Sequence, residues 1–398
     1  MLDELPIGFM LLGLTAYAVL GGADFGAGIW QLLAPGRPDV RDHAHSAMAP
    51  VWEANHVWLI FVLVIFWTAY PVAFGSVMST LSAPLFAAAV GIILRGMAYA
   101  MRSGARTGRE LRRVDLLFAT SSVLTPFALG VTVGAIASGR VPVGNAKGGL
   151  WDSWAHTTPL FAGALAVAVS AYLAAVYLAA DATRGGDRDM AEAFRARALV
   201  AGVVAGALAL VGLPIVHADA RHLWDGLTSG AALGAVLASG VAGTATLALL
   251  AARRYEPARY AGAAAVACVV LGWVLAQEPY LLPGLSVHEA AADRATLVAI
   301  VVGVAIGMTI LLPSLALLFR LVLSGTFETD PEPAPPPGPG RPPPGRGRLV
   351  VPAGLAAVGV PLAVLGERAG AYAGFTLLVA AIATGAVTLL GPALRDDG

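Results

Sequence analysis

The chain has 398 residues, of which 58% are hydrophobic and 13% are charged. Soluble domains carry about twice that share of charged residues, so the composition indicates a polytopic membrane protein. Basic and acidic side chains balance at 25 each, which argues against a nucleic-acid partner. The single cysteine, Cys268, excludes a disulfide framework, and the sequence holds no CxxC or CxxCH motif.

Long apolar runs follow one another along the chain, and about 20 apolar residues let a helix cross a bilayer. We expect an all-α helix bundle with a nine-span body and a two-span C-terminal hairpin. The first run is too long for a signal peptide, so we expect it to be retained as a span. The expected spans are 7–34, 53–71, 76–101, 115–138, 158–181, 197–216, 226–251, 260–276, 295–322, 349–365 and 371–394.

A proline-rich segment, ETDPEPAPPPGPGRPPPGRGR, interrupts this pattern at residues 328–348. Polar, proline-rich segments are extended and form no packed core. We therefore divide the chain into a membrane body at 1–327, a linker at 328–348 and a C-terminal transmembrane hairpin at 349–398.

Lysine and arginine concentrate in alternate loops, namely those that follow the first, third, fifth, seventh and ninth spans. Loops rich in these residues stay in the cytoplasm. The pattern predicts a multi-pass protein of a bacterial inner membrane, with its N-terminus outside and its C-terminus in the cytoplasm.

Four acidic, basic or histidine residues lie within the first three spans. Asp24 is in the first span, Glu53 and His56 open the second, and Arg95 is about two turns from the end of the third. The expected orientation puts all four near the cytoplasmic face. Ionisable residues at membrane depth are costly and often mark proton paths. Glu53 and His56 share one helix face, and histidine titrates near neutral pH. The four residues are therefore candidates for a proton path.

Simpler explanations remain open for the same side chains. Asp24 and Arg95 can form a purely structural buried pair. The helix dipole alone favours Glu53 at a helix N-terminus. Glu53 and His56 form one ExxH pair, whereas a di-iron bundle needs two, so we expect no metal site.

Glycines surround Asp24 on the first span. Gly22 and Gly26 form a GxxxG pair, and Gly28 follows. Small residues at this spacing let a second helix approach closely. A helix packed there would shield Asp24 from lipid, which fits either a proton path or assembly.

All seven histidines lie in loops or at the ends of expected spans. Axial haem ligands usually project from helices into a protected pocket, so we expect the chain to bind no haem by itself. The outer loops carry tryptophan-containing polar clusters at 150–159 and 217–226, and a polar stretch at 277–294. Tryptophan is normally an interface anchor, so we expect these loops to shape the surface rather than to catalyse a reaction.

Three motifs in this order, GGADFGAGIW, AMAPVWEANHVWLI and ILRGMAYAMR, resemble subunit II of the cytochrome bd-type quinol oxidases. The resemblance covers about residues 1–327. It matches Asp24 to an acid of the first motif, Arg95 to the third-span arginine, and Glu53 to an aspartate of the second motif. The frame of that second motif matches at Trp52, Asn55 and Trp58.

The resemblance implies a haem-free subunit that is not catalytic alone. Its partner, subunit I, would hold haem b, with or without haem d, and the quinol site. The complex would oxidise quinol and reduce oxygen to water, with cytoplasmic protons entering at Glu53. Small single-span accessory subunits and membrane lipid are the other expected partners.

Three features depart from the family pattern. Gly21 stands where the family carries a further acid, the second motif reads EANH in place of DGNE or DGNQ, and residues 328–398 have no counterpart. Two other functions therefore remain as alternatives. One is a haem-free proton-coupled transporter, and the other is a non-catalytic scaffold for a degenerate subunit I.

Overall fold

The computed structural model describes residues 2–34, 37–48, 52–102, 104 and 107–323, together with four isolated positions beyond them. The chain divides into two units, 1–334 and 335–398. The expected linker at 328–348 lies outside the described residues. Of the expected hairpin, only positions 354, 355, 358 and 377 are described. The account below concerns the first unit.

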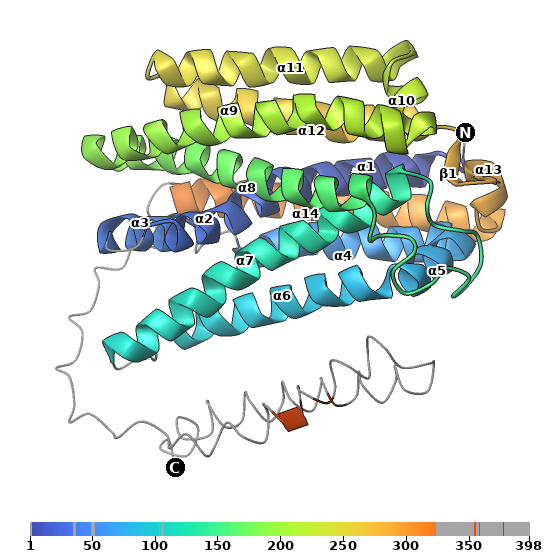
Figure 1. The fold of residues 1–398 in the computed structure, drawn as a ribbon, viewed down its shortest axis with the longest axis horizontal. Coiled ribbons are helices and arrows are strands. Elements are labelled where there is room, and N and C mark those ends of the chain that lie inside the picture. Colours follow the sequence, from blue (N-terminus) through green and yellow to red (C-terminus); the bar gives the residue numbers. More distant parts are fainter. Residues whose placement is uncertain are drawn as a thin grey trace. The chain divides into compact units, whose positions relative to one another are not determined.

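Helices and one short hairpin are the regular elements of the described part of the first unit, and a long loop joins α7 to α8 (Figure 1). A five-residue π-helical turn, η1, joins the first two helices into one continuous run. The helices are α1 (Leu5–Ala16), η1 (Tyr17–Gly21), α2 (Gly22–Leu32), α3 (Pro38–Met48), α4 (Trp52–Ala69), α5 (Pro71–Thr80), α6 (Ser82–Arg102), α7 (Gly108–Ala137), α8 (Thr157–Arg184), α9 (Arg188–Asp219), α10 (Arg221–Leu227), α11 (Gly230–Ala251), α12 (Tyr255–Gln277), α13 (Val287–Ala290) and α14 (Arg294–Leu323), and the antiparallel strands are β1 (Tyr280–Leu282) and β2 (Leu285–Ser286).

Eight helices in the described part of the chain are long and apolar enough to cross a membrane. They coincide with eight of the nine spans expected in the body. The remaining expected span, 53–71, falls on α4. The apolar part of α4, Asn55–Ala69, is shorter than any of the eight candidate membrane helices. The expected spans 349–365 and 371–394 fall outside the described residues, isolated positions apart.

Proline explains where the expected third span, 76–101, differs from the structure. α4 ends at Ala69, and Pro71 opens the separate helix α5. Proline lacks an N–H group but fits the first turn of a helix. A second break follows at Leu81, and Pro84 lies in the first turn of α6. The span therefore begins at Ser82, and the start predicted from hydropathy was wrong.

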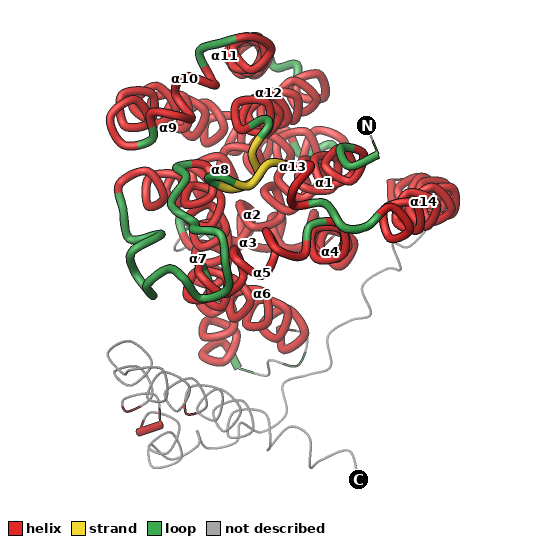
Figure 2. Tube along the Cα trace, turned by 90° about the vertical axis from the view of Figure 1, so that its right-hand side faces the viewer, coloured by secondary structure: helices red, strands yellow, loops and turns green. Residues whose placement is uncertain are grey.

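The helices of the first unit lie in layers, which Figure 2 shows almost end-on. One side is formed by α9 to α12, the middle by α1, α2, α3 and α8, and the other side by α4 to α7. The pairs α8–α9, α11–α12 and α6–α7 pack along each other, and α2 packs against both α7 and α8. We call the end of the bundle where α2 ends at Leu32 and α6 ends at Arg102 the α3 end, because α3 follows α2 there.

Close packing around α2 depends on two glycines. A Cβ atom at Gly26 would lie 1.9 Å from the Ser170 backbone oxygen on α8, and one at Gly28 would lie 2.1 Å from the Ser122 hydroxyl on α7. Only glycine leaves room for neighbours this close. As a result every residue from Gly22 to Gln31 is buried, including Asp24.

Candidate functional site: a buried acid–arginine pair

Asp24 on α2 and Arg95 on α6 form an ion pair inside the bundle. Their side chains are 1% and 2% exposed. Arg95 Nη2 donates to Asp24 Oδ1 at 2.8 Å and to the Asp24 backbone oxygen at 2.8 Å. Arg95 Nη1 donates to the other carboxylate oxygen, Oδ2. This two-pronged geometry is the strongest that an arginine makes with a carboxylate.

Groups on α7 and α2 make the remaining contacts of the Arg95 guanidinium, one hydrogen bond and two aromatic contacts. Its Nε donates to Ser122 Oγ at 3.0 Å, and that hydroxyl donates to the Phe118 backbone oxygen at 2.6 Å. The Arg95 Cζ atom lies 4.4 Å from the ring centre of Phe118 and 4.9 Å from that of Phe25. Aromatic faces attract a guanidinium, especially where water is excluded. The pair is therefore held from three helices, α2, α6 and α7.

α4 brings the second motif against the segment that precedes Asp24. Asn55 is 1% exposed, and its Nδ2 donates to the Leu20 backbone oxygen in η1 at 3.2 Å. The His56 ring meets the rings of Tyr17 and Phe25 edge-on, with centroid distances of 6.3 and 6.4 Å. Phe25 thus contacts both His56 and the guanidinium of Arg95.

Of the remaining residues of that motif, the structure describes the side chain of Trp58 but not those of Trp52 and Glu53. Trp58 is buried and belongs to a small apolar cluster with Tyr17 and Phe25. Trp52 and Glu53 are the first two residues of α4, but their side chains lie outside what the structure describes. The placement of Glu53 in the first helical turn agrees with its expected position at the start of the second span.

A second polar cluster lies at the α3 end. Arg102 bridges Asp42 of α3, at 2.7 Å, and Asp115 of α7, at 3.1 Å. The His45 ring stacks on Tyr99 at 5.0 Å between centroids. Burial and the nearby positive charge of Arg102 lower the pKa of His45 to about 4. This histidine is therefore neutral at physiological pH.

Phe118 separates these two clusters. Its ring lies under the Arg95 guanidinium and also meets the ring of His45 edge-on, at 6.2 Å between centroids.

In the described part of the chain, no three side chains among His, Cys, Asp and Glu come close enough to hold a metal ion.

Four residues of this region were missed from the sequence. Phe118 and Ser122 sit in an ordinary apolar helix pattern and gave no signal. Tyr17 precedes Asp24 by seven residues, but the π-helical turn between them cannot be seen in the sequence. Gln31 is 5% exposed, and its Nε2 makes no hydrogen bond to the described residues; its buried amide at the end of α2 was a signal that we overlooked.

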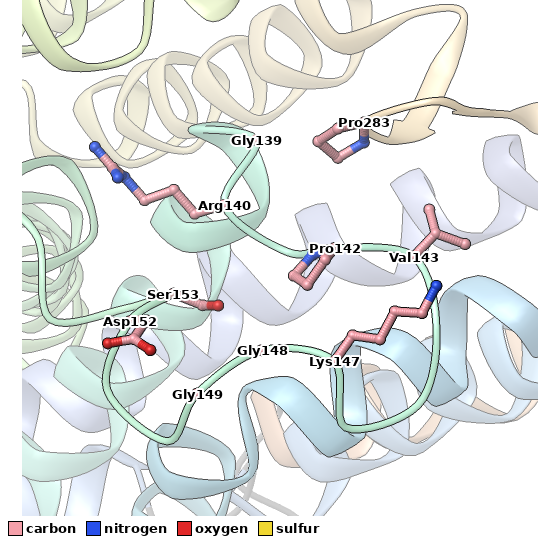
Figure 3. Close-up of a pocket in the computed structure, with 10 residues that line it drawn as sticks. All are labelled: Gly139, Arg140, Pro142, Val143, Lys147, Gly148, Gly149, Asp152, Ser153 and Pro283. Atoms are coloured by element: carbon pink, nitrogen blue, oxygen red, sulfur yellow. The ribbon is translucent and has the colours of Figure 1, made fainter.

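A solvent-facing pocket lies at the opposite end of the bundle, where the loop after α7 meets the β1–β2 turn (Figure 3). Its volume is about 560 Å³. Figure 3 shows Arg140 and Lys147 extending to opposite sides of it, and Arg140 is ion-paired with Asp219. The two cations therefore do not converge on one ligand. The lining residues are Gly139, Arg140, Pro142, Val143, Lys147, Gly148, Gly149, Asp152, Ser153 and Pro283.

The fold and the buried pair define a polytopic α-helical membrane protein with an ionisable centre between its helices. The sequence profile of the family described as "Cytochrome bd terminal oxidase subunit II" matches residues 2–322. The chain belongs to this family, as its three motifs predicted.

Two individual proteins are similar to this chain. A Bacillus subtilis (strain 168) protein named "Putative cytochrome bd menaquinol oxidase subunit II" is 23% identical over 220 residues, which cover 53% of this chain and 61% of the relative. The match therefore spans less than two thirds of the relative's length. A chain of the bd oxidase structure from Geobacillus thermodenitrificans has a TM-score of 0.65 at 23% identity, and the match covers 81% of this chain and 99% of that one. The structural match shows a shared fold.

Proposed function

We propose that this chain is subunit II of a bd-type quinol:oxygen oxidoreductase and pairs with a haem-bearing subunit I. The family match over residues 2–322 carries this proposal. The likeness in fold to the Geobacillus chain supports it. In the complex, subunit I holds haem b, with or without haem d, and oxidises the quinol. This chain contributes assembly surface and a route for protons, and it does not catalyse the reaction alone.

The proposed topology has nine spans in the body, with α4 crossing as the second. The lysine- and arginine-rich loops favour a cytoplasmic location for the α3 end. Asp24 and Arg95 then lie in the cytoplasmic half of the membrane, and Glu53 lies near its edge. The two further spans at 349–365 and 371–394 remain part of the proposal.

Protons for oxygen reduction enter from the α3 end. Glu53 takes up protons at the start of α4, and His56, on the same helix face, passes them inward. Asp24 receives them beside Arg95. The bonds from Arg95 hold the Asp24 carboxylate in place at the inner end of this route. The contacts of His56 with Phe25, and of Phe25 with Arg95, support a connection between these groups.

Replacing Glu53 tests the proposal. The Glu53→Gln variant, co-expressed with its subunit I, should keep the haem spectrum of the complex and lose at least about tenfold in oxygen reductase turnover, because a proton-transfer group contributes that much or more. Glu4→Gln is the matched control, since Glu4 is an exposed acid just ahead of α1. Equal turnover of the two variants would remove Glu53 from the path. A complex that shows no haem bands and no quinol-driven oxygen uptake would refute the oxidase assignment.

A further inference from the structure

The hydroxyl group of Tyr17 is a polar atom that packing alone does not explain. Tyr17 is 6% exposed, and its hydroxyl makes no hydrogen bond to any described residue. Burying a hydroxyl without a partner is unfavourable, whereas a phenylalanine ring would fill the same space without that penalty. A tyrosine that served only as apolar filler would be a poor choice at this position.

Tyr17 lies beside both groups that the proposed proton path has to connect, His56 and the Asp24–Arg95 pair. Its ring meets His56 edge-on at 6.3 Å and Phe25 edge-on at 6.2 Å. The Phe25 ring in turn lies against the ion pair, with the Arg95 Cζ atom 4.9 Å from its centre. Tyr17 therefore lies between the histidine of α4 and the ion pair of α2 and α6.

The backbone at Tyr17 has an unusual geometry. Tyr17 begins the π-helical turn η1, which ends at Gly21 and leads directly into α2. Such turns are rare and often occur at functional sites. Asn55 holds the turn from α4 through its bond to the Leu20 oxygen. A Cβ atom at Gly21 would lie 3.2 Å from the Tyr17 ring, so the ring lies directly over this glycine.

We propose that the Tyr17 hydroxyl is the hydrogen-bonding group that links His56 to the Asp24–Arg95 pair, through water molecules, in the proton path. This inference rests on the proposed function. The hydroxyl accepts a proton on its oxygen from the His56 side and releases its own proton towards Asp24. One O–H bond forms as the other breaks, the phenol is neutral before and after, and rotation about the C–O bond resets it.

Removing the hydroxyl alone tests this role. Tyr17→Phe should slow proton uptake after an oxygen pulse to the fully reduced complex by about tenfold, a loss of about 1.4 kcal/mol in barrier terms. Its solvent deuterium isotope effect on turnover should rise, because the proton step then limits the rate. The haem spectrum should stay the same. The melting temperature should be unchanged or higher, because a buried unpaired hydroxyl has been removed.

Tyr172→Phe is the matched control, because Tyr172 on α8 is also 6% exposed and its hydroxyl also lacks a partner among the described residues, but it lies against Gly202 of α9 and Gly262 of α12. It should leave proton uptake unchanged. The inference is overturned if Tyr17→Phe takes up protons at the wild-type rate while Glu53→Gln is slow, and the proposed function then stands. A Tyr17→Phe variant that loses stability or fails to assemble would also overturn it, since the hydroxyl would then be structural. If Glu53→Gln and Tyr17→Phe both behave as wild type, the proton-uptake function itself fails.

Discussion

Helices α2 and α11 are both rich in small residues, but they use them differently. At Gly26 on α2 the neighbouring α8 backbone comes so close that a Cβ atom would lie 1.9 Å from an oxygen. At Gly234, Gly240 and Gly243 on α11 a Cβ atom would have no neighbour within 4 Å. α2 also carries the buried Asp24, whereas α11 carries no charged residue. Of these two helices, only the one that carries a buried charge uses its glycines for close contact with its neighbours.

The buried ion pair gives the largest expected effect on stability. Arg95→Leu would leave the Asp24 carboxylate buried without its partner, which should destabilise the protein by about 3–5 kcal/mol. The exposed pair of Arg253 and Glu192, with side chains 65% and 40% exposed, is the matched control. Arg253→Leu should cost at most about 1 kcal/mol. Thermal unfolding of both variants in the same detergent makes the comparison.

A double variant sharpens this prediction. Asp24→Leu added to Arg95→Leu removes the unpaired charge, so the double variant should recover much of the lost stability. If Arg95→Leu is no less stable than Arg253→Leu, the pair is not a buried centre of the kind described above.

The glycine comparison gives a smaller effect. Gly26→Ala should destabilise the bundle by about 1–3 kcal/mol, because the contact is with backbone atoms that cannot move aside. Gly234→Ala should be neutral or stabilise by up to about 1 kcal/mol, because alanine is the better helix former and the space is open. The melting temperatures of the two purified variants measure this difference. Equal values would show that α8 can move away from α2 without loss of stability.

The smallest expected effect is a pH dependence at α3. His45 has its pKa lowered to about 4 by burial and by Arg102, and Asp42 and Asp115 also face it. Its neutral form is the one that the folded state favours. Docking of α3 should therefore weaken as the pH falls below about 6.5, the pKa of an unfolded histidine, towards 4.

Hydrogen exchange of residues 38–48 at pH 7 and pH 5 measures this effect. Lower protection factors, that is, faster exchange relative to the intrinsic rate at each pH, are expected at pH 5. His45→Phe should abolish the difference in protection, because it keeps the stack on Tyr99 without a titrating nitrogen. An equal pH response in wild type and His45→Phe would assign the effect to another group.

Hydropathy was sufficient to predict most of the membrane body, because each crossing helix needs a long apolar run and the loops between them are polar. It placed the start of α6 wrongly, since hydropathy does not detect the break between Pro71 and Pro84. The sequence allowed a buried pair between Asp24 and Arg95, but their bidentate contact could not be predicted. That contact depends on how closely α2, α6 and α7 approach one another. Ser122, Phe118 and the π-helical turn at Tyr17 are three-dimensional features without a sequence signal.

The side on which protons enter is the most direct test of the central claim. The complex is reconstituted in vesicles in a single orientation, with pH indicators on both sides, and a pulse of oxygen is given to the reduced enzyme. We expect protons to be taken up from the side that carries the α3 end, and we expect Glu53→Gln to slow this uptake at least about tenfold while electrons still reach the haems. Uptake from the opposite side, or at the wild-type rate in Glu53→Gln, would contradict the account.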